Sequence, residues 1–139
     1  MKTIVLLLFA ATGLLFACTP KPFLQPGPYL GVIRIDSADP SLDIPFNMTL
    51  SISTDGQRMV EVTNAGENIL LNEVTVSHDT LFMQFPVFSS EIVCRFTADS
   101  LIGSYFPKGR EAGIAYMFFA TYGVTDRFPA STEPDRKSV

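Results

Sequence analysis

The segment from Ile44 to Ser53 constrains the fold most, because apolar and polar residues alternate along it. Every even-numbered residue is apolar, and the odd-numbered residues from Asn47 onward are polar. Successive side chains of a β-strand point to opposite faces, so this period of two predicts a strand with one buried and one solvated face. Asp55 and Gly56 then form a pair that is typical of a tight hairpin turn.

Further segments of the same kind follow, separated by short stretches of turn-forming residues. The predicted strands are Tyr29–Asp36, Ile44–Ser53, Arg58–Thr63, Ile69–Ser77, Thr80–Phe85, Glu91–Thr97, Leu101–Phe106 and Gly113–Tyr122. Connections this short exclude parallel crossovers, so neighbouring strands should pair in an antiparallel meander. We therefore expect an all-β fold, either a barrel of the lipocalin or calycin kind or a two-sheet sandwich. Closure into a barrel is favoured because it leaves no exposed edge strand.

The amino-terminal segment predicts export. Lys2 is followed by an uncharged run from Ile4 to Ala17, which is shorter than the roughly 20 residues of a membrane-spanning helix but fits a signal peptide. The run ends in Leu15-Phe16-Ala17-Cys18, which resembles the lipobox of bacterial lipoproteins. This resemblance implies a diacylglycerol on Cys18 and a periplasm-facing, lipid-anchored protein of the cell envelope, with the outer membrane favoured. An ordinary cleaved signal peptide and an uncleaved anchor are the alternatives.

The chain is thereby divided into four parts. Residues 1–17 are the expected signal peptide, and residues 18–28 are an extended tether with four prolines. Residues 29–128 are the β domain, and residues 129–139 are a polar tail or linker.

Composition and charge limit the partners. The sequence is 47% hydrophobic and 17% charged, which is typical of a folded domain. Its 10 basic residues are scattered and outnumbered by 14 acidic ones, for a net charge of −4, so nucleic acid is not an expected partner.

Cys94 is the cysteine left in the expected mature chain once Cys18 is acylated, so no internal disulfide is expected. It lies in phase with Ile92 and Phe96, on the predicted buried face. A thiol in apolar surroundings has a raised pKa and is a poor nucleophile. We interpret Cys94 as a core residue, with a redox thiol that reacts with a partner as the alternative.

His78 is the single histidine, between Ser77 and Asp79 in a predicted turn. Neighbouring residues in a turn point in different directions, so these three are not expected to form a catalytic triad. With one histidine, a zinc site within the chain is not expected either. No cofactor is expected.

The remaining candidates are surface features and aromatic residues. The loop carrying Asp36, Asp39 and Asp43 has oxygen ligands for calcium, but its spacing does not fit an EF-hand loop, and a solvated loop is the preferred interpretation. Lys108 and Arg110 form a basic hairpin tip that can contact an anionic partner or be ordinary surface. Asn47-Met48-Thr49 matches a glycosylation sequon, which is incidental in a bacterial lipoprotein. Eight phenylalanines on or beside strands are expected mainly in the core, with the wall of a ligand-binding interior as the alternative: Phe46, Phe82, Phe85, Phe88, Phe96, Phe106, Phe118 and Phe119.

The order of several short segments carries a resemblance to a known family. They are Gly27-Pro28-Tyr29-Leu30-Gly31, Ile44-Pro45-Phe46-Asn47, Asn64-Ala65-Gly66-Glu67, Asp79-Thr80-Leu81, Phe85-Pro86-Val87-Phe88-Ser89-Ser90, Leu101-Ile102-Gly103-Ser104-Tyr105 and Arg127-Phe128. This succession looks like the amino-terminal β-rich region of TlpA-like thiol-disulfide oxidoreductase lipoproteins of Bacteroidota-type bacteria. In that family a thioredoxin-like domain with a Cys-x-x-Cys pair follows. The present sequence contains no Cys-x-x-Cys, so the resemblance implies a related domain without the catalytic dithiol, and no catalytic residue is assigned.

Three functions remain open at this stage. The first is a non-catalytic accessory domain that is held at the membrane by its lipid and positions or contacts a protein partner or redox domain. The second is a carrier of a small apolar ligand, which requires a cavity of about 300 Å³ or more. The third is an enzyme that forms mixed disulfides through Cys94.

Overall fold

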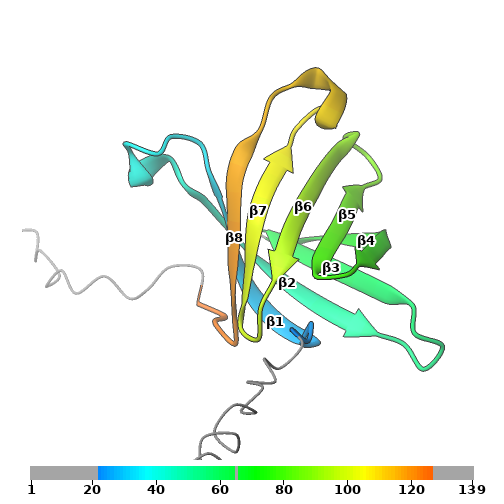
Figure 1. The fold of residues 1–139 in the computed structure, drawn as a ribbon. Helices are drawn as coiled ribbons and strands as arrows, with labels where there is room; N and C mark the ends of the chain where they lie inside the picture. Colours follow the sequence, from blue (N-terminus) through cyan, green and yellow to red (C-terminus); the bar gives the residue numbers. More distant parts are fainter. Residues whose placement is uncertain (1–21, 65, 127–139) are drawn as a thin grey trace, which may run out of the picture.

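The computed structural model describes residues 22–64 and 66–126, which form a closed antiparallel barrel (Figure 1). Each strand pairs with the next in sequence, and β8 closes the barrel by pairing with β1. The strands are β1 (Gly27–Arg34), β2 (Ile44–Ile52), β3 (Arg58–Asn64), β4 (Glu67–Ser77), β5 (Thr80–Phe85), β6 (Ser90–Phe96), β7 (Ser100–Phe106) and β8 (Tyr116–Tyr122). The predicted all-β meander is confirmed, and of the two expected closures the barrel is the one formed.

The alternation in β2 sets which residues face the barrel interior. Phe46, Met48 and Leu50 are buried, whereas Asn47 and Thr49 lie on the outer face. Each of the other strands contributes inward-facing residues in the same way, as expected for a barrel whose two faces alternate along every strand. The largest fully buried side chains are Tyr29, Phe118, Met48, Leu50, Leu71, Leu81, Met83, Ile92, Leu101, Val60 and Cys94.

Several predicted boundaries are wrong, including the end of the first strand, which is Arg34 and not Asp36, and the start of β4, which is Glu67 and not Ile69. The last strand begins at Tyr116 and not at Gly113, because Arg110–Ala112 form a short 3-10 turn that ends at Gly113 with φ of 71°. The extended tether was predicted to reach Pro28, but β1 already begins at Gly27. Residues just before β1 also belong to the barrel, since the Leu24 side chain is only 6% exposed.

Residues 22–26 cover one end of the barrel, which we call the closed end. Leu24 packs into the core there, and the Gln25 side chain donates a 2.6 Å hydrogen bond to the carbonyl of Ala98 in the β6–β7 turn. The Tyr29 hydroxyl donates in turn to the Gln25 carbonyl at 2.7 Å. In Figure 1 the start of β1 and the end of β8 both lie at this lower end. The opposite end, which we call the open end, carries the β1–β2, β3–β4, β5–β6 and β7–β8 connections.

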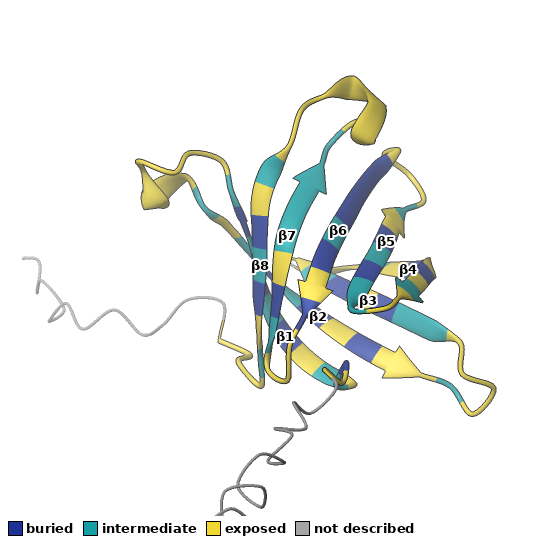
Figure 2. Cartoon of the chain, viewed as in Figure 1, coloured by how far each residue is buried: buried dark blue, intermediate teal, exposed yellow. Residues whose placement is uncertain are grey.

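The phenylalanines are less often in the core than expected. Phe46, Phe96 and Phe118 are buried. Phe88 is 62% exposed, and Phe119 lies on the outer wall under the guanidinium of Arg34, whose carbon is 5.1 Å from the ring centroid. Figure 2 shows buried, intermediate and exposed residues alternating along the strands. Phe82 and Phe106 likewise lie on the outer face, in phase with exposed residues of β5 and β7.

None of the helical turns within residues 22–64 and 66–126 is long or apolar enough to cross a membrane. The expected signal peptide and the lipid site Cys18 lie outside the described residues, as does the polar tail at 129–139.

Candidate functional site

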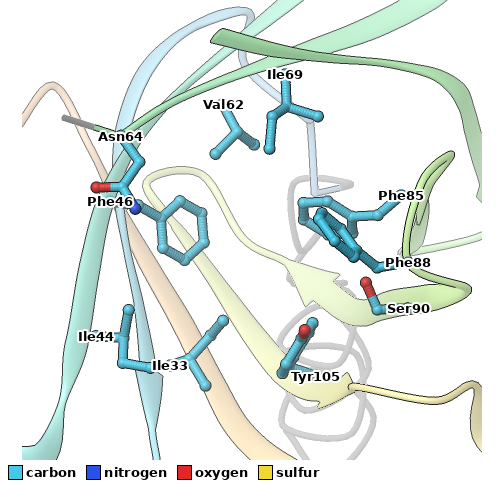
Figure 3. A pocket seen from close by; sticks show the side chains of 10 residues that line it. All are labelled: Ile33, Ile44, Phe46, Val62, Asn64, Ile69, Phe85, Phe88, Ser90 and Tyr105. Atoms are coloured by element: carbon cyan, nitrogen blue, oxygen red, sulfur yellow. The ribbon is translucent and has the colours of Figure 1, made fainter. Parts of the chain in front are cut away.

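An apolar pocket opens at the open end of the barrel and has a volume of about 190 Å³. Its lining side chains come from strands β1 to β7 and from the β5–β6 turn, and they point toward one another in Figure 3. They are Ile33, Ile44, Phe46, Val62, Asn64, Ile69, Phe85, Phe88, Ser90 and Tyr105. A dry apolar cavity of about 150 Å³ is large enough to hold one benzene ring. The pocket therefore has room for one ring or one branched aliphatic group.

The floor of the pocket depends on a pairing between β1 and β2. Gly31 lies directly opposite Phe46 in the β1–β2 register. A Cβ at Gly31 would lie 2.8 Å from two atoms of the Phe46 ring, so the glycine provides the space in which this ring lies. The Phe46 ring also stacks with that of Phe118, with centroids 6.2 Å apart. Phe46 lines the pocket and Phe118 is fully buried, so the stack connects the pocket wall with the core.

Three polar side chains interrupt the apolar lining. Ser90 and Tyr105 stand on neighbouring strands β6 and β7, and Asn64 lies across the mouth at the end of β3 (Figure 3). Ser90 is only 3% exposed, so its hydroxyl belongs to the wall of the pocket more than to the outer surface. The Tyr105 ring packs edge-on against Phe85, with centroids 6.3 Å apart. The pocket can thus offer hydrogen-bonding groups to an otherwise apolar occupant.

The β5–β6 turn forms one side of the mouth. Phe88 lines the pocket although 62% of its surface remains exposed. The next residue, Ser89, has φ of 51°, in the left-handed region that a serine rarely adopts. This turn conformation presents Phe88 at the mouth instead of burying it.

Cys94 lies in the core, as predicted. It is 1% exposed on β6 and pairs with Gly103 of β7. Burial raises the pKa of its thiol to about 12, so the thiolate is not formed near neutral pH. Neither a nucleophilic nor a redox role for Cys94 is favoured by this environment.

We expect Cys94 to resist labelling in the folded protein. In the Cys18→Ser variant of the full chain it is the only cysteine. Iodoacetamide at pH 8 should leave the native protein unmodified and should modify Cys94 fully once guanidinium chloride unfolds the barrel. Mass spectrometry measures both. Rapid modification without denaturant would contradict the assignment of Cys94 to the core.

The residues around His78 do not form a catalytic group. His78 lies in the turn between β4 and β5, and its Nδ1 is 3.2 Å from the Ser77 hydroxyl. The Asp79 carboxylate is instead engaged by the Arg95 side chain, a salt bridge on the exposed outer wall. Hydrogen bonding by Arg95 lowers the pKa of Asp79. Ser77 and His78 therefore interact within the turn, and Asp79 anchors the turn to Arg95 on β6.

The three aspartates of the β1–β2 connection each have a different hydrogen-bond partner. Asp43 accepts hydrogen bonds from Arg34 Nε at 3.1 Å and from Arg34 Nη2 at 2.8 Å, and these bonds lower its pKa. Asp39 accepts from the backbone N–H of Ser41 and caps a short 3-10 turn. Asp36 accepts from the backbone N–H of Ala38. Across the described ranges no group of three or more potential ligands is placed to hold a metal ion.

The basic hairpin tip turns back onto the barrel wall. Arg110 forms a 2.7 Å ion pair with Glu91, whose side chain is only 8% exposed. Its guanidinium also lies 5.8 Å above the Phe82 ring. This ion pair attaches the β7–β8 connection to the outer face of β6. Lys108, the other basic residue of the tip, forms no salt bridge with the described residues. Asn47 of the sequon is in the middle of β2 with its Oδ1 atom buried.

From the sequence, Phe46, Phe85 and Phe88 are expected mainly in the core and only in the alternative as a ligand wall, and the other pocket residues are not expected to form a site. Alternation predicts that Ile33, Phe46 and Val62 face inward, but it does not reveal that the interior is left unfilled at one end. The juxtaposition of Phe85–Ser90 with the ends of β1, β2 and β3 exists only in the closed barrel. Comparison of the chain with protein-family models, with curated proteins and with solved structures finds no match.

Proposed function

We propose that the chain is a non-catalytic accessory domain of a cell-envelope lipoprotein, related to those of thiol-disulfide oxidoreductases. In this proposal Cys18 holds it at a membrane, and the open end of the barrel binds an apolar group. The two ends of the barrel differ, and this difference carries the proposal. The described chain enters and leaves at the closed end, while the apolar pocket lies at the other. A lipid on Cys18 would thus tether the closed end and leave the pocket facing away from the membrane.

The chemistry of the described side chains supports binding without catalysis. Cys94 is buried with its thiol protonated, and the pocket lining has no ionisable carboxylate, lysine or histidine. Catalytic sites concentrate groups whose pKa values are tuned to a task. This pocket instead has the apolar walls and few polar groups of a recognition site.

A carrier of a small apolar ligand is the second candidate, and the same pocket is the observation in its favour. Ligand pockets for drug-sized molecules start at about 300 Å³, whereas this one measures about 190 Å³. The volume therefore favours one ring or one branched aliphatic group over a whole fatty acyl chain.

Binding of an apolar group is tested with toluene as the probe. The chain contains no tryptophan, so Phe88→Trp in the full chain with Cys18→Ser adds a single indole at the pocket mouth. Toluene should shift the indole emission and raise the unfolding temperature, because a ligand that binds only the folded state stabilises it. The matched control is Ile52→Trp, at an exposed position of the closed end, whose emission should not respond.

Filling the pocket should remove this response. Val62 lines the pocket and is 6% exposed, so Val62→Phe places extra ring atoms in the free volume. Ile69→Phe does the same from β4 should the first variant fold poorly. Toluene that stabilises the filled variants as much as the parent, or that leaves the parent unchanged, would count against the proposal.

A further inference from the structure

Several exposed apolar side chains lie at the open end of the barrel, and two of them, Ile44 and Phe88, also line the pocket. They belong to three connections of the open end, β1–β2, β5–β6 and β7–β8, or to strand ends beside them. A soluble domain rarely leaves a group of neighbouring large apolar side chains exposed to water, and such an exposed group marks an interaction surface. We call this set the apolar rim: Ile35, Leu42, Ile44, Val87, Phe88 and Ile114, which are 38%, 49%, 45%, 73%, 62% and 44% exposed.

The rim indicates an occupant larger than the pocket. A free small ligand is usually buried over most of its surface, but here one wall of the pocket, Phe88, is itself largely exposed. A ligand confined to 190 Å³ would leave Val87 and Leu42 in water. Protein interfaces have the complementary anatomy, in which one anchor side chain fills a central pocket while surrounding residues exclude water.

The charge beside the mouth indicates the character of the partner. Asp36 and Asp39 are exposed on the β1–β2 connection and join no salt bridge within the described part of the chain. The third carboxylate of that connection, Asp43, is already neutralised by Arg34. Hydrogen bonds from Ser41 lower the pKa of Asp39, so it is ionised at neutral pH. The β1–β2 connection at the open end therefore carries two uncompensated negative charges, which favour a positive group on the partner.

We propose that the open end docks an extended segment of a partner protein. The segment inserts one bulky apolar side chain into the pocket, covers the apolar rim with its neighbours, and places a lysine or arginine beside Asp36 and Asp39. This inference rests on the proposed function and specifies its partner.

The experiment compares three probes on the full chain carrying Cys18→Ser and Phe88→Trp. The first is N-acetyl-phenylalanine amide, a single anchor side chain. The second is a short peptide with phenylalanine at its centre, leucines beside it and lysines at its ends, and the third is palmitate. Indole emission measures each affinity. The peptide should bind at least about tenfold more tightly than the amide, a difference of about 1.4 kcal/mol. Exchanging its central phenylalanine for alanine, or its lysines for glutamates, should remove most of this gain.

Variants separate the rim from the pocket. Val87→Ser should weaken the peptide and leave the amide unaffected, because Val87 belongs to the rim but not to the pocket lining. Asp36→Asn with Asp39→Asn should weaken the lysine peptide and reduce its dependence on salt. Thr49→Ser, on the outer face of β2, is the control and should change nothing.

The outcomes distinguish the two proposals. Equal binding of amide and peptide overturns the docking inference while the apolar pocket of the proposed function stands. Tight binding of palmitate that displaces the amide also overturns it, in favour of a lipid carrier. Absence of binding by every probe, together with no response to toluene, overturns both.

Discussion

Replacing Gly103 by alanine is expected to destabilise the barrel by about 3 kcal/mol, the upper part of the usual range for overpacking a core. A Cβ at this position would lie 2.0 Å from the carbonyl oxygen of Val93 and 2.5 Å from the Cα of Cys94. Both are backbone atoms of the neighbouring strand, so no side-chain rotation relieves the clash. β6 and β7 would have to separate where they pair through Cys94 and Gly103. Urea denaturation followed by circular dichroism measures the change in the free energy of unfolding.

The matched control is Gly56→Ala in the β2–β3 turn. Gly56 has φ of 84° but no atom within 4 Å of an added Cβ, so its cost is restricted to backbone strain of about 1–2 kcal/mol. Gly103→Ala should be clearly the worse variant of the two. Equal destabilisation would mean that β6 and β7 lie further apart than the structure has them.

The barrel could be predicted from sequence because its determinants are local. The alternation of Ile44–Ser53 fixes which face of β2 is buried, and Asp55 with Gly56 provides the reversal that pairs β2 with β3. The connections between the later strands are too short for a parallel crossover, so each strand pairs antiparallel with the next. Local patterns favour closure without deciding it, because a two-sheet sandwich can protect its edges in other ways; the pairing of β8 with β1 is what leaves no edge strand.

The errors concern residues whose place depends on contacts across the barrel. Leu24 follows two prolines, a pattern that predicts a tether, yet its side chain is buried against the core at the closed end. Phe119 lies between the inward-facing Phe118 and Ala120, so alternation places it on the outer face, whereas its aromatic character predicts the core. It is accommodated outside because Arg34 of the adjacent strand lies over its ring. Neither contact is visible in a local pattern.

The pocket could not be predicted for a related reason. Whether a barrel interior is filled depends on how side chains from different strands pack against one another, and a pattern of apolar residues does not contain this information. Gly31 illustrates the point. In the sequence it is one glycine in a strand, but in the barrel it is the position opposite Phe46 that lets the ring lie over β1 and leave space above it.

Truncating Phe118 to alanine should cost about 3–5 kcal/mol and should also deepen the pocket. Phe118 is 0% exposed, and its ring supports that of Phe46, which lines the pocket. Its removal leaves a void next to the Phe46 ring, on which the pocket borders. Because an apolar cavity of this kind binds aromatic solutes, toluene should restore part of the lost stability and should stabilise the variant more than the parent.

Leu101→Ala provides the control for the second effect. Leu101 is 1% exposed and pairs with Phe96 and Ala120, in the half of the barrel near the closed end. Its truncation should cost about 2–5 kcal/mol without enlarging the pocket, so the increment in unfolding temperature that toluene gives the parent should be unchanged. If toluene stabilised both variants alike, the ligand would be entering any void in the core. The contact of Phe118 with the pocket residue Phe46 would then have no special part in shaping the apolar pocket of the open end.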